Sequence, residues 1–175
     1  MELASTKVSM TRWPARLGFL LFVGGAWFVA DQVTKQMAQE GARTRVAVFD
    51  SWWHFHYVEN RAGAFGLFSN ISESWRMPFF YVVGTLCIGF LIAYYFSLPP
   101  TLKLPQWSLA IMIGGALGNF ADRVRLRYVV DFIQWHVGDR FYWPTFNIAD
   151  TAVVVGAALM ILDSFREPRR QSAPG

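Results

Sequence analysis

Four segments of the chain are apolar and long enough to cross a membrane. Each consists mostly of uncharged residues, and the second and third contain no charged residue at all. Their expected bounds are about 13–37, 77–98, 104–121 and 144–165. Because a helix needs ~20 mostly apolar residues to cross the hydrocarbon core of a bilayer, the pattern predicts four transmembrane helices.

The first of these segments has a second interpretation. Its apolar centre, 17–30, follows several basic residues, which is also the pattern of a secretory signal peptide. However, no small residues spaced for cleavage follow it, because Phe28 and Ala30 lead directly into Asp31. We therefore expect a retained spanning helix.

A short link and three glycines predict how the helices pack. Residues 99–103, PPTLK, join the second and third spans, so we expect these spans to form an antiparallel hairpin. Gly114, Gly115 and Gly118 place small residues on one face of the third span, where another helix can approach closely.

The long connection between the first and second spans predicts a small sheet. Residues 51–60, SWWHFHYVEN, alternate aromatic side chains with histidines, which is the period of a strand, and Trp and Tyr favour a membrane interface. The following NRAGAFG, 60–66, is suited to a turn. The expected fold class is therefore mainly α. We expect one integral membrane domain over 1–175, with four transmembrane helices and, at about 43–70, a small β-sheet and loop cradle at the membrane surface.

The composition supports a membrane protein. Of the 175 residues, 54% are hydrophobic and only 16% are charged, whereas soluble domains carry about 25% charged residues. The net charge of +4 does not indicate nucleic-acid binding, since the basic residues form no stripe and several flank the spans, where they can contact lipid headgroups. Because basic residues lie on both sides of the bundle, the positive-inside rule does not decide its orientation. The single cysteine, Cys87, excludes an intramolecular disulfide and is expected to be a buried, inert thiol.

Four aspartates are predicted to lie on one side of the membrane. They occupy span ends or the loops of that side, at Asp31, Asp122, Asp131 and Asp150. Burial and like-charge repulsion raise one pKa of a carboxylate pair, so that the two groups share a proton near neutral pH. The ionised member can then deprotonate a water while the protonated member polarises a scissile carbonyl, which is the chemistry of an aspartic protease.

Structural roles could also explain most of these acids. Three have a partner close by in the sequence: Asp31 with Lys35, Asp122 with Arg123, and Asp150 with Asn147. The first pair is one helical turn apart, and the last is spaced as a capping box at a helix start. Only Asp131, which stands among apolar neighbours in VVDFI, has no evident partner.

Other chemistries find little support in the sequence. His54 and His56 could bind a metal, but no cysteine or third histidine lies near them, so we expect them, like His136, to be strand-surface histidines. A Ser/His/Asp set and a glycine-rich phosphate loop are not evident. A proton- or cation-coupled transporter is the alternative use of the acids, but acids at span ends rather than at the midplane are not typical of one. A non-catalytic membrane scaffold is a further alternative, but it does not explain why aspartates stand among apolar neighbours.

Five blocks of the sequence together resemble a known family. In order, they are DQVTK (31–35), NRAGAFG (60–66), GGALGNFADR (114–123), VVDF (129–132) and FNIADT (146–151). Their order and spacing are similar to those of lipoprotein signal peptidase, signal peptidase II. The resemblance implies a globomycin-sensitive bacterial inner-membrane aspartyl peptidase with four helices, which cleaves diacylglyceryl-modified prolipoproteins before the lipidated cysteine. It also implies cytoplasmic termini and a periplasmic site.

The resemblance further implies roles for individual residues. The catalytic dyad would be Asp131 and Asp150, without a metal or other cofactor. The supporting polar residues would be Asp31, Lys35, Asn60, Asn119, Asp122, Arg123 and Asn147. One block departs from the family pattern, N-x-G-A-A-F, because this chain has Ala62 and Gly63 where that pattern has glycine and alanine. The expected partners are prolipoproteins carrying diacylglyceryl-cysteine and membrane lipid, and the expected state is a monomer.

Overall fold

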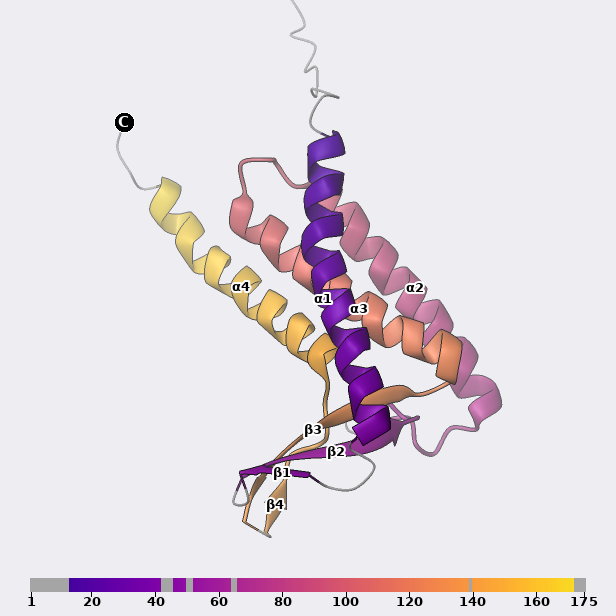
Figure 1. Cartoon of the computed structure of the whole chain (residues 1–175). Helices are drawn as coiled ribbons and strands as arrows, with labels where there is room; N and C mark the ends of the chain where they lie inside the picture. Colours follow the sequence, from indigo (N-terminus) through magenta and orange to yellow (C-terminus); the bar gives the residue numbers. More distant parts are fainter. Residues whose placement is uncertain (1–12, 42–45, 50–51, 64–65, 139, 172–175) are drawn as a thin grey trace, which may run out of the picture.

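Four helices and a small sheet make up the part of the chain that the structure describes. This computed structural model describes residues 13–41, 46–49, 52–63, 66–138 and 140–171, with side chains as far as 166. The helices are α1 (Trp13–Gly41), α2 (Glu73–Ser97), α3 (Lys103–Leu126) and α4 (Ile148–Gln171). They form a bundle that meets the sheet at one end, and α1 begins and α4 ends at the opposite end (Figure 1).

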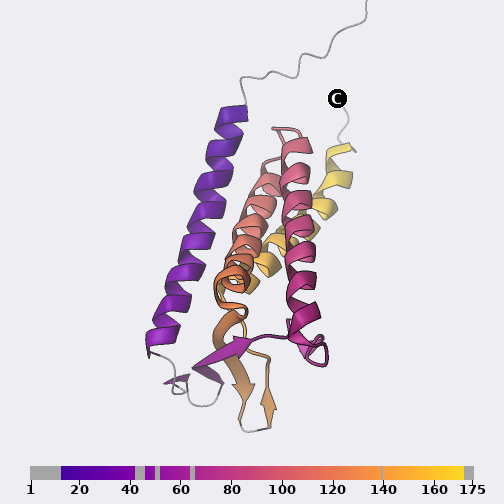
Figure 2. The same cartoon turned by 90° about the vertical axis from the view of Figure 1, so that its right-hand side faces the viewer.

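The third helix lies at the centre of the bundle. It packs against α1, α2 and α4, and the short link 98–102 joins it to the antiparallel α2, as the sequence predicted (Figure 2). The glycines of α3 allow this close packing. A Cβ at Gly114 would meet the backbone oxygen of Gly24 in α1, and a Cβ at Gly115 would meet the backbone oxygen of Ala149 in α4. The prediction of a glycine-lined packing face is therefore confirmed.

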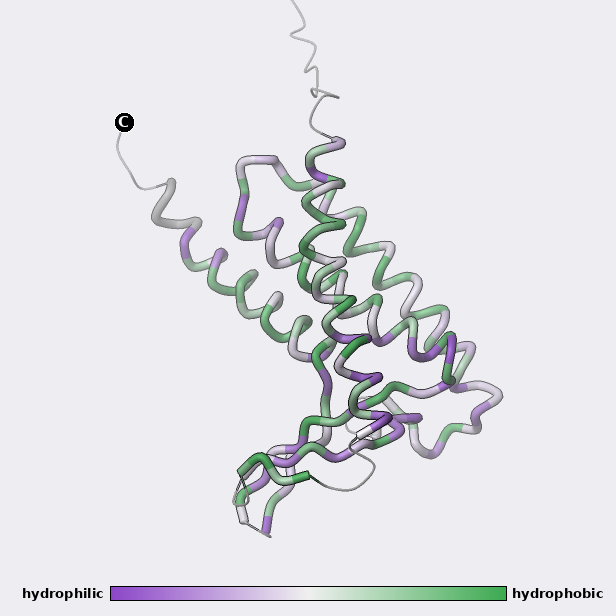
Figure 3. The backbone as a smooth tube through the Cα atoms, in the orientation of Figure 1, coloured by the Kyte–Doolittle hydropathy of each residue, from purple (hydrophilic) through white to green (hydrophobic). Residues whose placement is uncertain are grey.

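Three of the helices have the length and apolarity of a membrane span. These are α1, α2 and the Ile148–Arg166 part of α4, along which apolar residues predominate (Figure 3). The segment 104–121, also predicted to span, is helical but does not belong to this group. The physical reason is its central position. Since its neighbours cover much of its surface, α3 can bury polar residues such as Gln106, Ser108 and Asp122 against them.

The sheet is larger than the sequence indicated. Its antiparallel strands are β1 (Val46–Phe49), β2 (Trp53–Asn60), β3 (Val129–Val137) and β4 (Phe141–Tyr142), paired in that order. The predicted strand in 51–60 is confirmed as β2. The strands β3 and β4 lie outside the expected sheet region, 43–70. The stretch around Asp131 was expected to be a loop, but it forms the strand β3. Five consecutive residues of β3, 129–133, are buried, so its sequence shows no alternation of polar and apolar positions.

Cys87 does not have the environment expected for it. Its side chain is exposed on α2 rather than buried in the bundle. Since α2 has the composition of a membrane span, this exposed side belongs to the surface suited to lipid.

Candidate active site

A large cavity lies where the bundle meets the sheet. Its volume is about 1060 Å³, and residues from β2, α2, α3, β3 and α4 line it. Five of the polar residues singled out in the sequence are among them: Asn60, Asn119, Arg123, Asp131 and Asp150. Asn60 and Asp150, which lie 90 positions apart in the sequence, therefore line the same cavity.

The two aspartates of this cavity are held by the same residue, Asn147. Its side-chain Nδ2 donates a hydrogen bond of 2.7 Å to Oδ1 of Asp131, and its backbone N–H donates one of 3.2 Å to Oδ2 of Asp150. Asn147 is fully buried, and Asp131 is only 1% exposed. Because both bonds start from one rigidly enclosed residue, the positions of the two carboxyl groups are coupled.

The contact between Asn147 and Asp150 is also the capping box predicted from the sequence. The backbone N–H of Asp150 donates to Oδ1 of Asn147 at 2.9 Å, which is the reciprocal of the bond to the Asp150 carboxylate. Asn147 thus stands immediately before α4, and Asp150 lies in its first turn. The positive end of the helix dipole favours a carboxylate there. Capping and placement of the carboxylate in the cavity are therefore one arrangement.

Two further asparagines bind the remaining carboxylate oxygens. Nδ2 of Asn60 donates to Oδ2 of Asp131 at 2.9 Å, and Nδ2 of Asn119 donates to Oδ1 of Asp150 at 2.7 Å. Asn60 is itself fixed by a turn, since its Oδ1 accepts hydrogen bonds from the backbone N–H groups of Ala62 and Gly63. Gly63 has a φ of 81°, in the region that favours glycine. The glycine that departs from the family pattern therefore occupies a left-handed position of this turn.

A buried ionic cluster supports the cavity from behind. Nζ of Lys35 lies 2.8 Å from Oδ2 of Asp31 and 2.9 Å from Oδ2 of Asp122, and it donates to Oδ1 of Asn119 at 2.9 Å. The side chains of both ion pairs are at most 3% exposed. Lys35 on α1 is therefore bound to three side chains, two of which belong to α3.

The two carboxylates of this cluster also reach the chain beside the cavity aspartates. Oδ1 of Asp31 accepts the backbone N–H of Ala149 at 2.9 Å, one residue before Asp150. Oδ2 of Asp122 accepts the backbone N–H of Val130 at 3.0 Å, one residue before Asp131. The cluster thus fixes the backbone at both places where a cavity aspartate is attached.

The pairing of Asp122 with Arg123 expected from the sequence is wrong. The ion partner of Asp122 is Lys35, because consecutive residues of a helix point in different directions. The guanidinium of Arg123 instead lies 4.5 Å from the ring centroid of Phe80, and Nη1 donates to the backbone oxygen of Asn119 at 3.3 Å. Arg123 therefore faces the cavity, while Asp122 faces the ionic cluster.

The pKa of Asp131 is strongly perturbed. Burial, and after it the negative charge of Asp150, raises this pKa from 3.8 to about 7, although the amides of Asn60 and Asn147 lower it. Asp131 is therefore largely protonated below neutral pH, whereas a solvent-exposed aspartate is ionised there.

The sequence did not single out several residues of the cavity wall. Trp135 and Trp143 form an aromatic side, and Arg61 and Arg76 add two cations to Arg123. Trp135 follows Asp131 by four residues on β3, so the two lie on the same face of that strand. Had β3 been recognised as a strand, this spacing would have revealed Trp135.

The three histidines lie on the sheet, away from these carboxylates. His54 on β2 stacks on His136 on β3 with ring centroids 4.4 Å apart, and His136 is buried rather than on the strand surface as expected. Within the described ranges, no three side chains of the metal-ligating types form a group that could hold a metal ion.

Comparison with known proteins identifies relatives over most of the chain. Residues 15–166 match the family model described as signal peptidase (SPase) II. A lipoprotein signal peptidase from Syntrophotalea carbinolica is 32% identical over 91% of this chain and 98% of its own, and one from Geobacter sulfurreducens is 36% identical over 82% and 89%. One from an Anaeromyxobacter species is 45% identical over 63% of this chain, a match that spans about half (53%) of that relative.

Solved structures show the same fold. A bacterial membrane enzyme determined by the in meso method at 2.3 Å resolution superposes with a TM-score of 0.77, at 25% identity over 90% of this chain and 94% of its own. A second, at 1.9 Å resolution, gives a TM-score of 0.72 at 28% identity over 83% and 92%. Together with the match over 15–166, these likenesses show that the chain belongs to the signal peptidase II family, the membrane-embedded aspartic peptidases that cleave the signal peptide from prolipoproteins.

Proposed function

We propose that this chain removes the signal peptide from diacylglyceryl-modified prolipoproteins by cleaving before the lipidated cysteine, with Asp131 and Asp150 as its catalytic pair. One observation carries the proposal. The two carboxyl groups line the same cavity, and Asn147 donates a hydrogen bond to each of them. Two carboxyl groups held in this way can activate a water and a carbonyl together.

The surroundings of the two aspartates support a different role for each of them. Asp131 carries the shared proton, because burial and the charge of Asp150 raise its pKa to about 7. Asp150 is the ionised member, since it stands in the first turn of α4, where the positive end of the helix dipole stabilises a carboxylate. Asp150 therefore takes a proton from the attacking water, while Asp131 donates its proton to the carbonyl oxygen of the scissile bond.

The supporting residues act through position. Asn60 and Asn119 orient the two carboxyl groups, while Lys35 with Asp31 and Asp122 holds the backbone behind them. Arg123 provides a positive charge at the cavity wall, where substrate carbonyl groups would lie. No step of this reaction needs a metal ion.

The location of the cavity suits a substrate that stays in the membrane. The cavity lies at the sheet end of the bundle, so a peptide bond can reach it while the attached lipid and signal helix stay beside apolar helices. We propose that α3 spans the membrane with the other three helices, as one monomeric domain in the bacterial inner membrane. In this arrangement the cavity faces the periplasm and both termini lie in the cytoplasm.

A cleavage assay on the purified full chain tests the function. Incubation in detergent with a diacylglyceryl-modified prolipoprotein should release the signal peptide, and the same prolipoprotein without the lipid should stay intact. Asp131→Asn and Asp150→Asn should each reduce the rate by about 10⁴-fold while the protein stays folded, and EDTA should change nothing. The matched control is Asp163→Asn, a carboxylate of α4 outside the cavity. Retention of a tenth or more of the activity by either cavity variant would show that this aspartate is not catalytic.

A further inference from the structure

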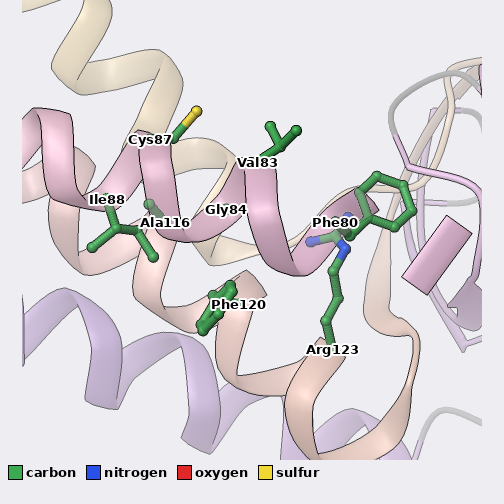
Figure 4. Close-up of a pocket in the computed structure, with 8 residues that line it drawn as sticks. All are labelled: Phe80, Val83, Gly84, Cys87, Ile88, Ala116, Phe120 and Arg123. Atoms are coloured by element: carbon green, nitrogen blue, oxygen red, sulfur yellow. The ribbon is translucent and has the colours of Figure 1, made fainter. Parts of the chain in front are cut away.

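A second, smaller hollow lies on the membrane-facing side of the bundle, between α2 and α3 (Figure 4). We refer to it as the α2–α3 crevice. It measures about 200 Å³, and its walls are Phe80, Val83, Gly84, Cys87, Ile88, Ala116, Phe120 and Arg123. All of these except Arg123 are apolar, so the crevice has an apolar length and one charged end.

Small residues lie on both walls of the crevice. At Gly84 a Cβ would lie 2.7 Å from the ring of Phe120, and Ala116, one turn before Phe120 on α3, presents only a methyl group. Cys87 and Val83 on the outer wall are exposed, and α2 has the composition of a membrane span. The crevice is therefore open to the lipid phase, which excludes a polar occupant along most of its length.

The charged end of the crevice shares one residue with the active-site cavity. Arg123 lines both hollows, with its guanidinium over the ring of Phe80. A guanidinium has five N–H donors, and the one side-chain bond described for Arg123 runs from Nη1 to Asn119. Further N–H groups of Arg123 are thus able to donate to an acceptor placed beside its guanidinium at this end of the crevice.

The size of the crevice decides what can enter it. A volume of about 200 Å³ has room for roughly seven groups of the size of a water molecule, which is enough for the first part of a long acyl chain. A helix with its side chains is about 10–12 Å across and cannot fit, which excludes the signal helix of a substrate. A single alkyl chain that ends in an ester matches both the narrow apolar length and the donor at its end.

We propose that the α2–α3 crevice binds one acyl chain of the substrate's diacylglyceryl group, with Arg123 donating to the ester carbonyl. This inference rests on the proposed function. The lipidated cysteine directly follows the scissile bond, so its ester groups lie beside the catalytic pair, at the end of the crevice that Arg123 shares with the cavity. Occupation of the crevice then selects lipidated substrates and sets the scissile bond at a fixed distance from the membrane.

Larger side chains in the crevice test the proposal, because they should weaken the binding of a substrate with long acyl chains and not of one with short chains. Cys87→Trp and Ala116→Leu should raise KM at least about tenfold for a prolipoprotein with palmitoyl chains, which is the effect of one misplaced methylene group in an apolar pocket. The kcat should stay unchanged, as should KM for the same prolipoprotein with butyryl chains. Leu86→Trp is the control, because Leu86 is the neighbouring exposed residue of α2 but does not line the crevice. Equal effects on both substrates, or none, would overturn the proposal.

The single cysteine of the chain provides an independent measurement that needs no cleavage. Cys87 in the Asp150→Asn protein should lose its reactivity toward an apolar maleimide when the palmitoyl substrate is bound, and should keep it with the butyryl substrate. Equal protection by phosphatidylglycerol alone would mean that ordinary membrane lipid fills the crevice, which contradicts a substrate site. Failure of the wild type to cleave either substrate would refute the proposed function. The labelling of Cys87 does not depend on cleavage, so it would still show whether an acyl chain enters the crevice.

Discussion

At the scale of single residues, Asn147 sets the geometry of the site. One side chain caps α4, and the same residue donates to Asp131 from its amide and to Asp150 from its backbone. A displacement of either carboxyl group therefore strains the start of a helix. An asparagine suits this position because its two N–H donors reach Asp131 and the backbone oxygen of Val130 while its Oδ1 caps the helix, whereas serine or threonine has a single O–H donor.

The raised pKa of Asp131 predicts the pH dependence of cleavage. The protonated form is the active one in the proposed mechanism, so kcat/KM should fall as the pH rises through about 7, the pKa of this group. An aspartate with an unshifted pKa of 3.8 would lose its proton, and the activity, far below neutral pH. A pH profile of kcat/KM with the palmitoyl substrate measures this limb. A profile that stays flat through alkaline pH would contradict the assignment of Asp131 as the acid.

A spectroscopic titration provides the control for this profile. The charge of Asp150 contributes to the raised pKa of Asp131, so the pKa of Asp131 should be lower in Asp150→Asn than in the wild type. Burial is the larger cause and remains, so the value should stay above 3.8. Carboxyl carbon NMR of both proteins measures the difference.

Removal of the charge of Lys35 should destabilise the protein more than any other single change in the ionic cluster. Lys35→Met leaves Asp31 and Asp122 buried without their cation, and loss of one partner of a buried ion pair costs about 3–5 kcal/mol. Asp122→Asn should cost less, because Lys35 keeps Asp31. Thermal unfolding in detergent measures both, with Lys103→Met at the exposed start of α3 as the control. Equal melting temperatures for Lys35→Met and the control would show that the cluster contributes no stability.

At the scale of elements, close helix packing places Asp150. The backbone oxygen of Ala149, one residue before Asp150, lies where a Cβ of Gly115 would stand. Gly115→Ala should push the start of α4 away from α3, moving Asp150 and reducing kcat without preventing insertion into the membrane. Gly89→Ala on α2 is the matched control, because a Cβ there meets no atom within 4 Å and alanine favours the helix. Cleavage by Gly115→Ala at the rate of the control would contradict this role of α3.

The elements also show what the sequence could predict. Its apolar runs predicted the helices, and its alternating aromatic residues predicted β2, because these patterns repeat locally. The strand β3 was missed because both its faces are covered around Asp131, which removes the alternation from its sequence. Lys35 was missed as the partner of Asp122 because they lie on different helices, and no local pattern reports a contact between α1 and α3.

At the scale of the whole molecule, the polarity of α3 follows from its place. Three helices with apolar surfaces surround one helix that carries Asn119, Asp122 and Arg123 near the sheet end. These polar groups contact Lys35 and the cavity instead of lipid, so the bundle can hold charged groups near the membrane surface. Apolarity alone is therefore a poor guide to whether α3 spans the membrane.

The orientation of the bundle can be tested with single cysteines at its two ends. Ser72 lies exposed just before α2 at the sheet end and makes no capping hydrogen bond, while Thr101 lies exposed in the link between α2 and α3 at the other end. In a Cys87→Ser background, a membrane-impermeant maleimide added to intact spheroplasts should label Ser72→Cys and leave Thr101→Cys unlabelled until the cells are lysed. This result is expected because the lipidated substrate meets water on the periplasmic side, where the proposed active site lies. The labelling decides the question because basic residues lie at both ends of the bundle and favour neither orientation. The reverse pattern would place the cavity with Asp131 and Asp150 in the cytoplasm and contradict the proposed topology.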